Sequence, residues 1–232
     1  MSGPQRGYCL IVNNFKFSCS SPKLRNRTGT VKDAESLSLV FTWLGFQVEV
    51  VKDATRDKML SSMRELASRD HSGMDCVACI VLSHGLEGGV YGVDGGVVRL
   101  EKLKWYVNGE QCRSLIGKPK LFFIQVHDQT DGPSGPGSIP ITADFLISMS
   151  TPPSHVSWRD RKKGTWFIQS LYKNLILRVP RNKDLLSILT EVNNDVSKNS
   201  NPNSSMRQMP QPIHTLRMGV FFPVPEELPP SL

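Results

Sequence analysis

Short apolar runs alternate with stretches of helical periodicity over the first 128 residues of the chain. The runs at residues 8–13, 47–52, 76–82 and 121–125 are typical of buried strands. Between them, residues 32–45 and 55–67 carry apolar side chains at helical spacing, and Gly45 reads as a helix stop. Residues 90–100, interrupted by glycines, indicate a small hairpin. This order predicts an α/β fold with a mostly parallel central sheet and helices on both faces.

A segment rich in Gly, Pro and Ser at residues 129–140 separates this half from the rest, and we interpret it as an exposed linker. After it, residues 145–149 predict a strand, and a last strand is expected from Thr215 to Phe222. Two helices are expected between these strands, because apolar residues recur there at helical spacing. The first helix would contain Phe167, Leu171 and Leu175, and the second Leu185, Leu189, Val192 and Val196. The expected organisation is a first half at 1–128, the linker at 129–140, a second half at 141–223 and a loose Pro-rich tail at 224–232.

Composition and charge narrow the function classes. The chain has 232 residues, with 28 Lys and Arg against 21 Asp and Glu, which gives a formal net charge of +7. We interpret this excess as a solvated basic face and expect no nucleic-acid partner, because the basic residues are spread along the chain. The tightest basic cluster lacks an aromatic platform and a basic helix, and it consists of Arg159, Arg161, Lys162 and Lys163.

The apolar runs are too short to cross a bilayer, and the residues before Tyr8 lack the apolar core of a signal peptide. We therefore expect a cytoplasmic protein without membrane association. The cysteines are odd in number and scattered, which is typical of reduced thiols and not of a disulfide framework. They are Cys9, Cys19, Cys76, Cys79 and Cys112.

Two of the predicted strands lead directly into histidine, one at His84 and one at His127. In an open parallel sheet, ligands bind beyond the carboxyl ends of the strands. A single histidine there is usually a loop residue with satisfied hydrogen bonds, whereas two at equivalent edges indicate a cleft.

Several short stretches, in this order, resemble the successive signatures of the caspase family: residues 7–14 (GYCLIVNN), 82–85 (LSHG), 91–95 (YGVDG), 117–125 (GKPKLFFIQ), 156–159 (VSWR) and 208–212 (QMPQP). The resemblance is nearest to the initiator branch of the caspase-eight and caspase-ten type. That branch is indicated by residues 143–146 (ADFL), 166–171 (WFIQSL) and 188–193 (ILTEVN).

The resemblance implies the caspase fold, a three-layer α/β/α sandwich, and cleavage of peptide bonds after aspartate. By position, His84 matches the histidine that organises proton transfer, and Gly85 matches the residue whose N–H binds the developing oxyanion. An aspartate side chain calls for planar, bidentate cations in its pocket. The positions that match this pocket are Arg27, Gln125, Ser157, Trp158 and Arg159.

The family's nucleophile signature, Gln-Ala-Cys-(Arg/Gln/Gly)-Gly, is broken in this chain. The sequence reads Gln125-Val126-His127-Asp128-Gln129, so that His127 stands at the nucleophile position and Gln129 replaces the glycine. An imidazole forms no thiolate and gives an unstable acyl adduct. None of the cysteines is expected to attack in its place, since Cys19 and Cys112 fall in loops away from both strand edges. We therefore expect no protease activity.

The organisation of the chain departs from the family as well. The linker is shorter than the cleavable segment that usually separates the two halves, and Asp131, followed by Gly132, is a candidate cleavage site for another caspase. No death-effector or CARD prodomain is expected ahead of the first strand.

The leading hypothesis is an inactive caspase homologue that regulates cell-death signalling. It would pair with an initiator caspase of the caspase-eight or caspase-ten type, or with itself, through the last strand. One alternative is an active aspartate-specific cysteine endopeptidase. Another is a non-cleaving module that binds Asp-containing peptides through Arg27, Gln125 and Arg159. The competing interpretation of the two arginines is that they only anchor loops through salt bridges.

A zinc site is a weak further alternative, because His84, His127 and Asp128 fall at one edge of the predicted sheet. Three ligands on loops are a weak signal for a metal site. We therefore expect no metal and no cofactor.

Overall fold

The computed structural model describes residues 1, 3, 5–19, 22–128, 143–151, 159–160, 163–199 and 207–232, with the backbone alone at residues 127–128 and 159–160. The predicted linker, the candidate cleavage residue Asp131 and the predicted pocket residues Ser157 and Trp158 lie outside this set.

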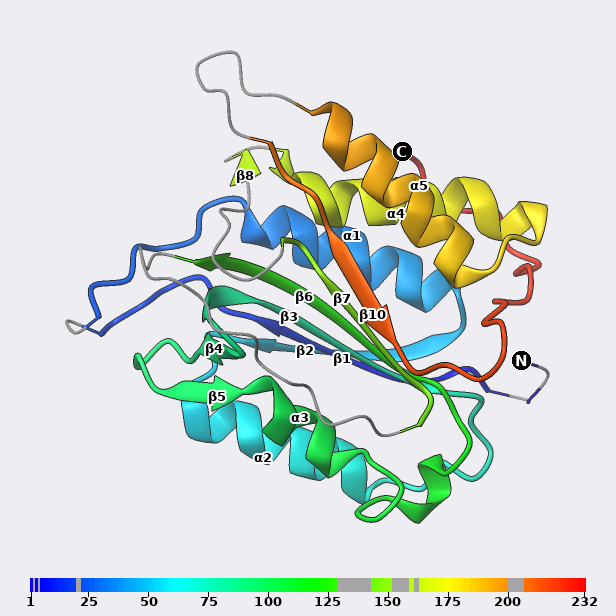
Figure 1. Ribbon diagram of the computed structural model, residues 1–232, viewed down its shortest axis with the longest axis horizontal. Coiled ribbons are helices and arrows are strands. Elements are labelled where there is room, and N and C mark those ends of the chain that lie inside the picture. Colours follow the sequence, from blue (N-terminus) through cyan, green and yellow to red (C-terminus); the bar gives the residue numbers. More distant parts are fainter. Residues whose placement is uncertain are drawn as a thin grey trace.

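In the described part of the chain, eight strands form one sheet, whose main path runs β10-β7-β6-β3-β1-β2 (Figure 1). The pairs β1/β2, β1/β3, β3/β6 and β6/β7 are parallel, while β10 is antiparallel to β7. The sheet is therefore mostly parallel, as predicted. Its strands are β1 (Gly7–Asn13), β2 (Phe46–Lys52), β3 (Val77–Leu86), β4 (Gly89–Tyr91), β5 (Val97–Arg99), β6 (Lys120–Asp128), β7 (Phe145–Met149) and β10 (Gln211–His214).

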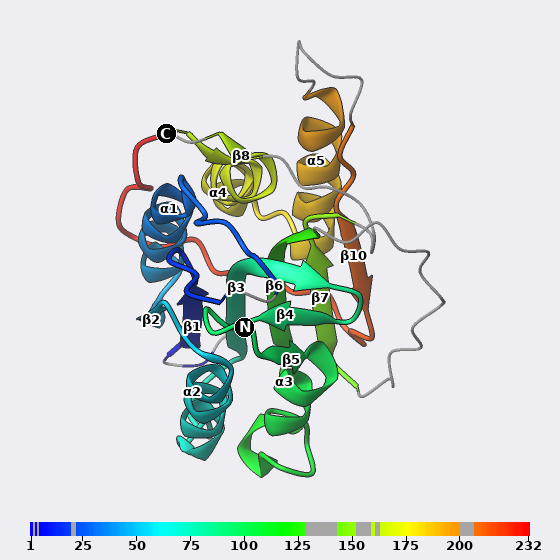
Figure 2. The same cartoon turned by 90° about the vertical axis from the view of Figure 1, so that its left-hand side faces the viewer.

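Helices cover both faces of this sheet, which confirms the predicted three-layer α/β/α sandwich (Figure 2). One face carries α1 (Thr30–Trp43), α4 (Trp166–Arg178) and α5 (Leu185–Lys198), and the other carries α2 (Arg56–Ser68) and α3 (Leu100–Tyr106). A separate ribbon joins β8 (Arg159–Asp160) to β9 (Gly164–Thr165). Short 3-10 turns lie at Arg113–Leu115 and Val179–Arg181.

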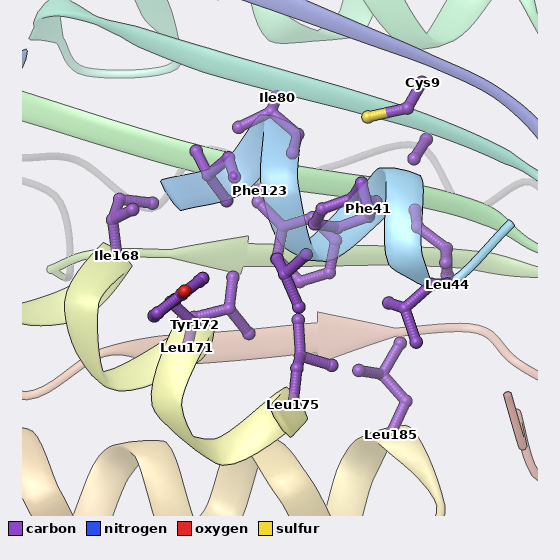
Figure 3. Packing of buried hydrophobic residues seen from close by; sticks show 14 of the residues in the cluster. Cys9, Phe41, Leu44, Ile80, Phe123, Ile168, Leu171, Tyr172, Leu175 and Leu185 are labelled. Carbon is purple, nitrogen blue, oxygen red and sulfur yellow. The ribbon is translucent and has the colours of Figure 1, made fainter. Parts of the chain in front are cut away.

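Each face has its own apolar core because strand side chains alternate between the two sides. In β6, Leu121 and Phe123 pack with α1 and α4, whereas Phe122 and Ile124 pack with α2 and α3. Figure 3 shows Phe123 beside Phe41 of α1, with ring centroids 5.8 Å apart.

Local signals explain where the helices begin and end. Thr55, Thr165 and Asp184 cap α2, α4 and α5, because their side-chain oxygens accept hydrogen bonds from backbone N–H groups of the first turn. Gly45 has a φ of 88°, in the left-handed region that favours glycine, which agrees with its predicted role as a helix stop. Helix α3 was not predicted, since its start was assigned to the hairpin.

The prediction of a last strand from Thr215 to Phe222 is wrong. The last strand is β10, which ends at His214. Thr215 still donates to the Phe145 carbonyl at 2.8 Å and accepts from the Asp144 N–H at 3.0 Å, and beyond it the chain leaves the sheet. Val220 and Phe222 are buried in the core under α1, α4 and α5, and the Leu185 N–H donates to the Val220 carbonyl at 2.8 Å. The alternation of buried and exposed side chains at residues 220–222 therefore reflects packing beneath helices and not pairing with a strand.

The tail at 224–232, predicted to be loose, forms no helix or strand and is mostly exposed, but two hydrogen bonds connect it to helices. The Trp43 indole N–H donates to the Glu227 carbonyl at 3.0 Å, and the Tyr172 hydroxyl donates to the Ser231 carbonyl at 2.7 Å. Two helices from different halves of the chain thus hold this segment.

We predict that Phe123→Ala lowers the free energy of unfolding by about 3–5 kcal/mol, because it leaves a cavity at a fully buried site between the sheet and α1. Urea unfolding followed by circular dichroism measures this change. Phe221→Ala is the matched control, because Phe221 is exposed, and we expect it to cost less than about 1 kcal/mol. Equal losses in the two variants would contradict the assigned core.

Candidate functional site

The pairing of β3 with β6 brings the predicted site positions to one edge of the sheet. The register pairs Leu82 with Gln125, His84 with His127, and Gly85 with Asp128. The sequence predicted that this strand ends at Leu82. Strand β3 instead continues to Leu86, because Gly85 and Leu86 also pair with β4. His84 is therefore held inside a strand between two neighbours and does not lie in a loop.

His84 is buried, and its ring is oriented from the loop that follows β1. Its Nε2 lies 2.7 Å from the Arg25 carbonyl oxygen, and since a carbonyl only accepts, the ring donates there. The edge of the ring packs against Phe17, with centroids 4.8 Å apart. This contact places the proton of the neutral ring on Nε2 and makes Nδ1 the accepting nitrogen, which is the orientation a general base requires.

Gly85 of β3 lies next to the side chain of Val126 of β6. A Cβ added at Gly85 would come within 2.6 Å of the Val126 Cβ and within 2.9 Å of one of its methyl groups. The family signature has alanine where this chain has Val126, so that both methyl groups are additional bulk next to the predicted oxyanion residue. Val126 was missed in the sequence, although its departure from the signature was visible.

Arg27 is fully buried and ties the loop before α1 to the end of β1. Its Nη1 donates to the Asn14 carbonyl at 3.1 Å and to the Thr30 hydroxyl at 3.0 Å. The Thr30 hydroxyl in turn donates to the Asn13 side-chain oxygen at 2.7 Å. In this structure Arg27 therefore acts as a loop anchor. Gln125, the second described pocket residue, is also buried, within β6.

Asp33 of α1 links the two halves of the chain. Its carboxylate accepts hydrogen bonds from the Thr165 N–H at 2.9 Å and from the Gln169 side-chain amide at 2.8 Å. Thr165 belongs to β9 and pairs with Arg159 of β8, so that Asp33 holds the partner strand of the one that carries the predicted pocket arginine. Burial raises the pKa of Asp33 to about 6, although the hydrogen bonds from Gln169 and Thr165 act in the opposite direction.

Asp33 was also missed in the sequence. The signal was a carboxylate on the apolar stripe of the helix that Leu37, Phe41 and Leu44 continue. A charged residue at such a position is rare unless other groups satisfy it.

The described cysteines offer no evident substitute nucleophile. Cys9, Cys76 and Cys79 are buried, and burial raises the pKa of the Cys79 thiol to about 12 and the pKa values of the other two well above the ordinary range. The loop of Cys19 lies nearer to the site than expected, because Phe17, two residues earlier, contacts His84. An activity test therefore has to include a Cys19 variant.

The backbone alone places the remaining predicted site positions: His127 lies in β6 and Arg159 in β8. Among the side chains that the structure describes, no three His, Cys, Asp or Glu residues are grouped so that they could hold a metal ion. The zinc alternative depends on His127 and Asp128 and stays a prediction. None of the described helices combines the length and the apolar character that a bilayer span requires.

The mostly parallel sheet and the paired strand ends match a known family. The caspase domain model of peptidase family C14 matches residues 6–221, and this chain belongs to that family.

Its relatives include rat (Rattus norvegicus) caspase-8, which is 44% identical over 96% of this chain and 52% of the relative. Mouse (Mus musculus) caspase-3 is 40% identical over 85% of this chain and 74% of the relative. Human (Homo sapiens) caspase-9 is 36% identical over 93% of this chain and 61% of the relative. The chain thus spans about half the length of the caspase-8 relatives that it matches.

We predict that Asp33 makes the stability of the protein depend on pH between about 4 and 6. Because its folded-state pKa is raised from 3.8, the proton binds the folded state more tightly. The resulting stability is fully present below pH 4 and is lost as the pH rises through 6, with a change on the order of 3 kcal/mol. Urea unfolding of the parent chain and of Asp33→Asn across this range measures the difference.

Glu35→Gln, an exposed neighbour on the same helix, is the control, and its unfolding curves should follow those of the parent chain. If the free energies of the parent and of Asp33→Asn changed in parallel over this pH range, the assignment to Asp33 would be wrong.

Proposed function

We propose that this chain is a caspase-domain protein without protease activity, and that it regulates a caspase of the caspase-8 type by pairing with it. The observation that carries the proposal is His127, which stands where the family signature has its nucleophilic cysteine and is paired in register with His84.

The chemistry at this edge supports the first part of the proposal. His84 keeps a carbonyl partner that orients its ring, so that the means of proton transfer persists. Without a thiolate beside it, that histidine has no acyl-accepting atom to activate. The methyl groups of Val126 are a second departure, because they place bulk beside Gly85 that the alanine of the family signature lacks.

The sheet edge at β10 supports the second part. Strand β10 is the outermost strand of the main path, so that one side of its backbone pairs with no other strand in the described structure. Ile213 of this strand is 38% exposed, and Met209 just before it is also exposed. Two antiparallel edges of this kind can pair about a twofold axis and extend both sheets. The proposed contact is therefore Gln211–His214 and not the segment expected from the sequence.

The burial of Arg27 bears on the alternative of an aspartate-binding module. Its hydrogen bonds to Asn14 and Thr30 hold the loop closed, and the side chain has no exposed surface. A peptide could reach it only after this loop opens. We therefore place that alternative second to regulation by pairing.

We predict that the purified chain does not cleave a peptide ending in Asp-fluorophore above buffer. His127→Cys should give at most weak turnover, because Val126 and Gln129 still depart from the signature, and adding Val126→Ala should raise that turnover. The fluorescence release rate is the measurement.

A Cys19→Ser chain is assayed in parallel, so that any signal from Cys19 is recognised. Turnover by the parent chain that persists after contaminating proteases have been removed would refute the inactive assignment.

We predict a complex with the catalytic domain of a caspase-8-type initiator, observed by sedimentation velocity. Ile213→Lys should weaken it at least tenfold, because it places a charge in the paired edge. Leu39→Lys is the control, since Leu39 is 56% exposed on α1 and lies outside the β10 edge. The absence of a complex, or equal affinities of the two variants, would contradict pairing through β10.

A further inference from the structure

The segment at residues 223–232 lies against the outer surface of α1 and α4. Its direct hydrogen bonds to these helices come from Trp43 and Tyr172, which donate to the carbonyls of Glu227 and Ser231. Figure 2 shows the segment, coloured red, running beside α1 and ending near α4. The chain thus carries a segment without helix or strand, bent at residues 226–227, that contacts its own surface.

Apolar side chains contribute little to this docking. Val224, Leu228 and Leu232 are exposed, and Leu228 is 90% accessible to solvent. The half-buried residues of the segment are Pro225 and Pro230. The segment therefore contacts the rest of the chain through two backbone carbonyls, and two of its prolines are partly covered. Proline-rich segments are commonly recognised by aromatic side chains that donate hydrogen bonds to their carbonyls.

The two donors are suited to such a segment. Trp43 and Tyr172 are each only 8% exposed, and they come from helices more than 120 residues apart in the sequence. Each combines an apolar ring with a single N–H or O–H, which donates to a carbonyl of the segment. The tail is rich in proline, with Pro223, Pro225, Pro229 and Pro230, which restricts its backbone and lowers the entropy lost on docking.

We propose that Trp43 and Tyr172 form a docking site for proline-rich peptide segments, which residues 223–232 occupy in cis and which a proline-rich segment of another protein enters by displacing them. The inference does not depend on the absence of protease activity or on pairing through β10. Figure 2 shows α1 and β10 on opposite sides of the molecule.

The connection to the core makes such an exchange feasible. Val220 and Phe222, just before the segment, are buried, and Phe222 packs against Phe46 with ring centroids 6.0 Å apart. The tail can therefore leave its site while these residues stay in place. As long as it is tethered, its effective concentration is on the order of millimolar, which keeps the site filled against weak competitors.

The test uses a chain of unchanged length in which residues 224–232 are replaced by Gly and Ser. Calorimetry measures the binding of a synthetic peptide with the sequence of residues 223–232 to this chain and to the parent. We expect the Gly/Ser chain to bind the peptide and the parent to bind it at least about tenfold more weakly, because its own tail competes. A peptide with all four prolines replaced by alanine should bind more weakly than the native peptide.

In the Gly/Ser chain, Tyr172→Phe keeps the ring and removes its donor, and Trp43→Phe removes the donor while keeping a smaller aromatic ring. Each should weaken binding about fivefold. Trp105→Phe is the matched control, because Trp105 lies on α3, on the other face of the sheet, and it should leave binding unchanged. Cooperative thermal unfolding establishes that each variant is folded.

Three results would overturn the proposal. The first is that the folded Gly/Ser chain binds the native peptide and its alanine version equally well. The second is that the parent binds the peptide as tightly as the Gly/Ser chain does. The third is that both donor variants bind the peptide as tightly as Trp105→Phe does.

Discussion

The pairing of β3 with β6 is the constraint on which the rest of the site depends. It joins residues 77–85 to residues 120–128 through an unbroken parallel register in the middle of the sheet. Apolar side chains from both strands are buried on both faces, so that a shift of one residue would exchange the two cores. The same register that packs the core therefore fixes His84 beside His127, whatever chemistry that edge performs.

A second set of contacts holds the loops around this edge. Arg27 joins the end of β1 to the start of α1, and Asp33, one turn into that helix, fastens β9 and α4. These groups are buried, and their hydrogen bonds offset the cost of removing them from water. The network includes no residue at position 127, so that the scaffold does not depend on a cysteine there.

Much of the fold could be predicted because buried strands and amphipathic helices leave periodic patterns. The runs ending at Asn13, Lys52 and Met149 became strands at nearly the expected bounds. The last strand was misplaced because Val220 and Phe222 alternate like a strand but pack under helices. The docked tail escaped prediction because its partners, Trp43 and Tyr172, are distant in sequence and bind its backbone carbonyls, which leave no pattern in the sequence.

Motif matching predicted His84, Gly85, Arg27 and Gln125 as site residues, and their roles stay predictions, whereas Asp33 and Val126 emerged only from contacts between elements. The central claim is that position 127 lacks a nucleophile within an otherwise oriented site. Intact-mass spectrometry after treatment with an irreversible peptide probe ending in aspartyl fluoromethyl ketone tests it most directly. We expect no adduct on the parent chain and an adduct at position 127 in the double variant His127→Cys/Val126→Ala. A stoichiometric adduct on the parent chain would contradict it.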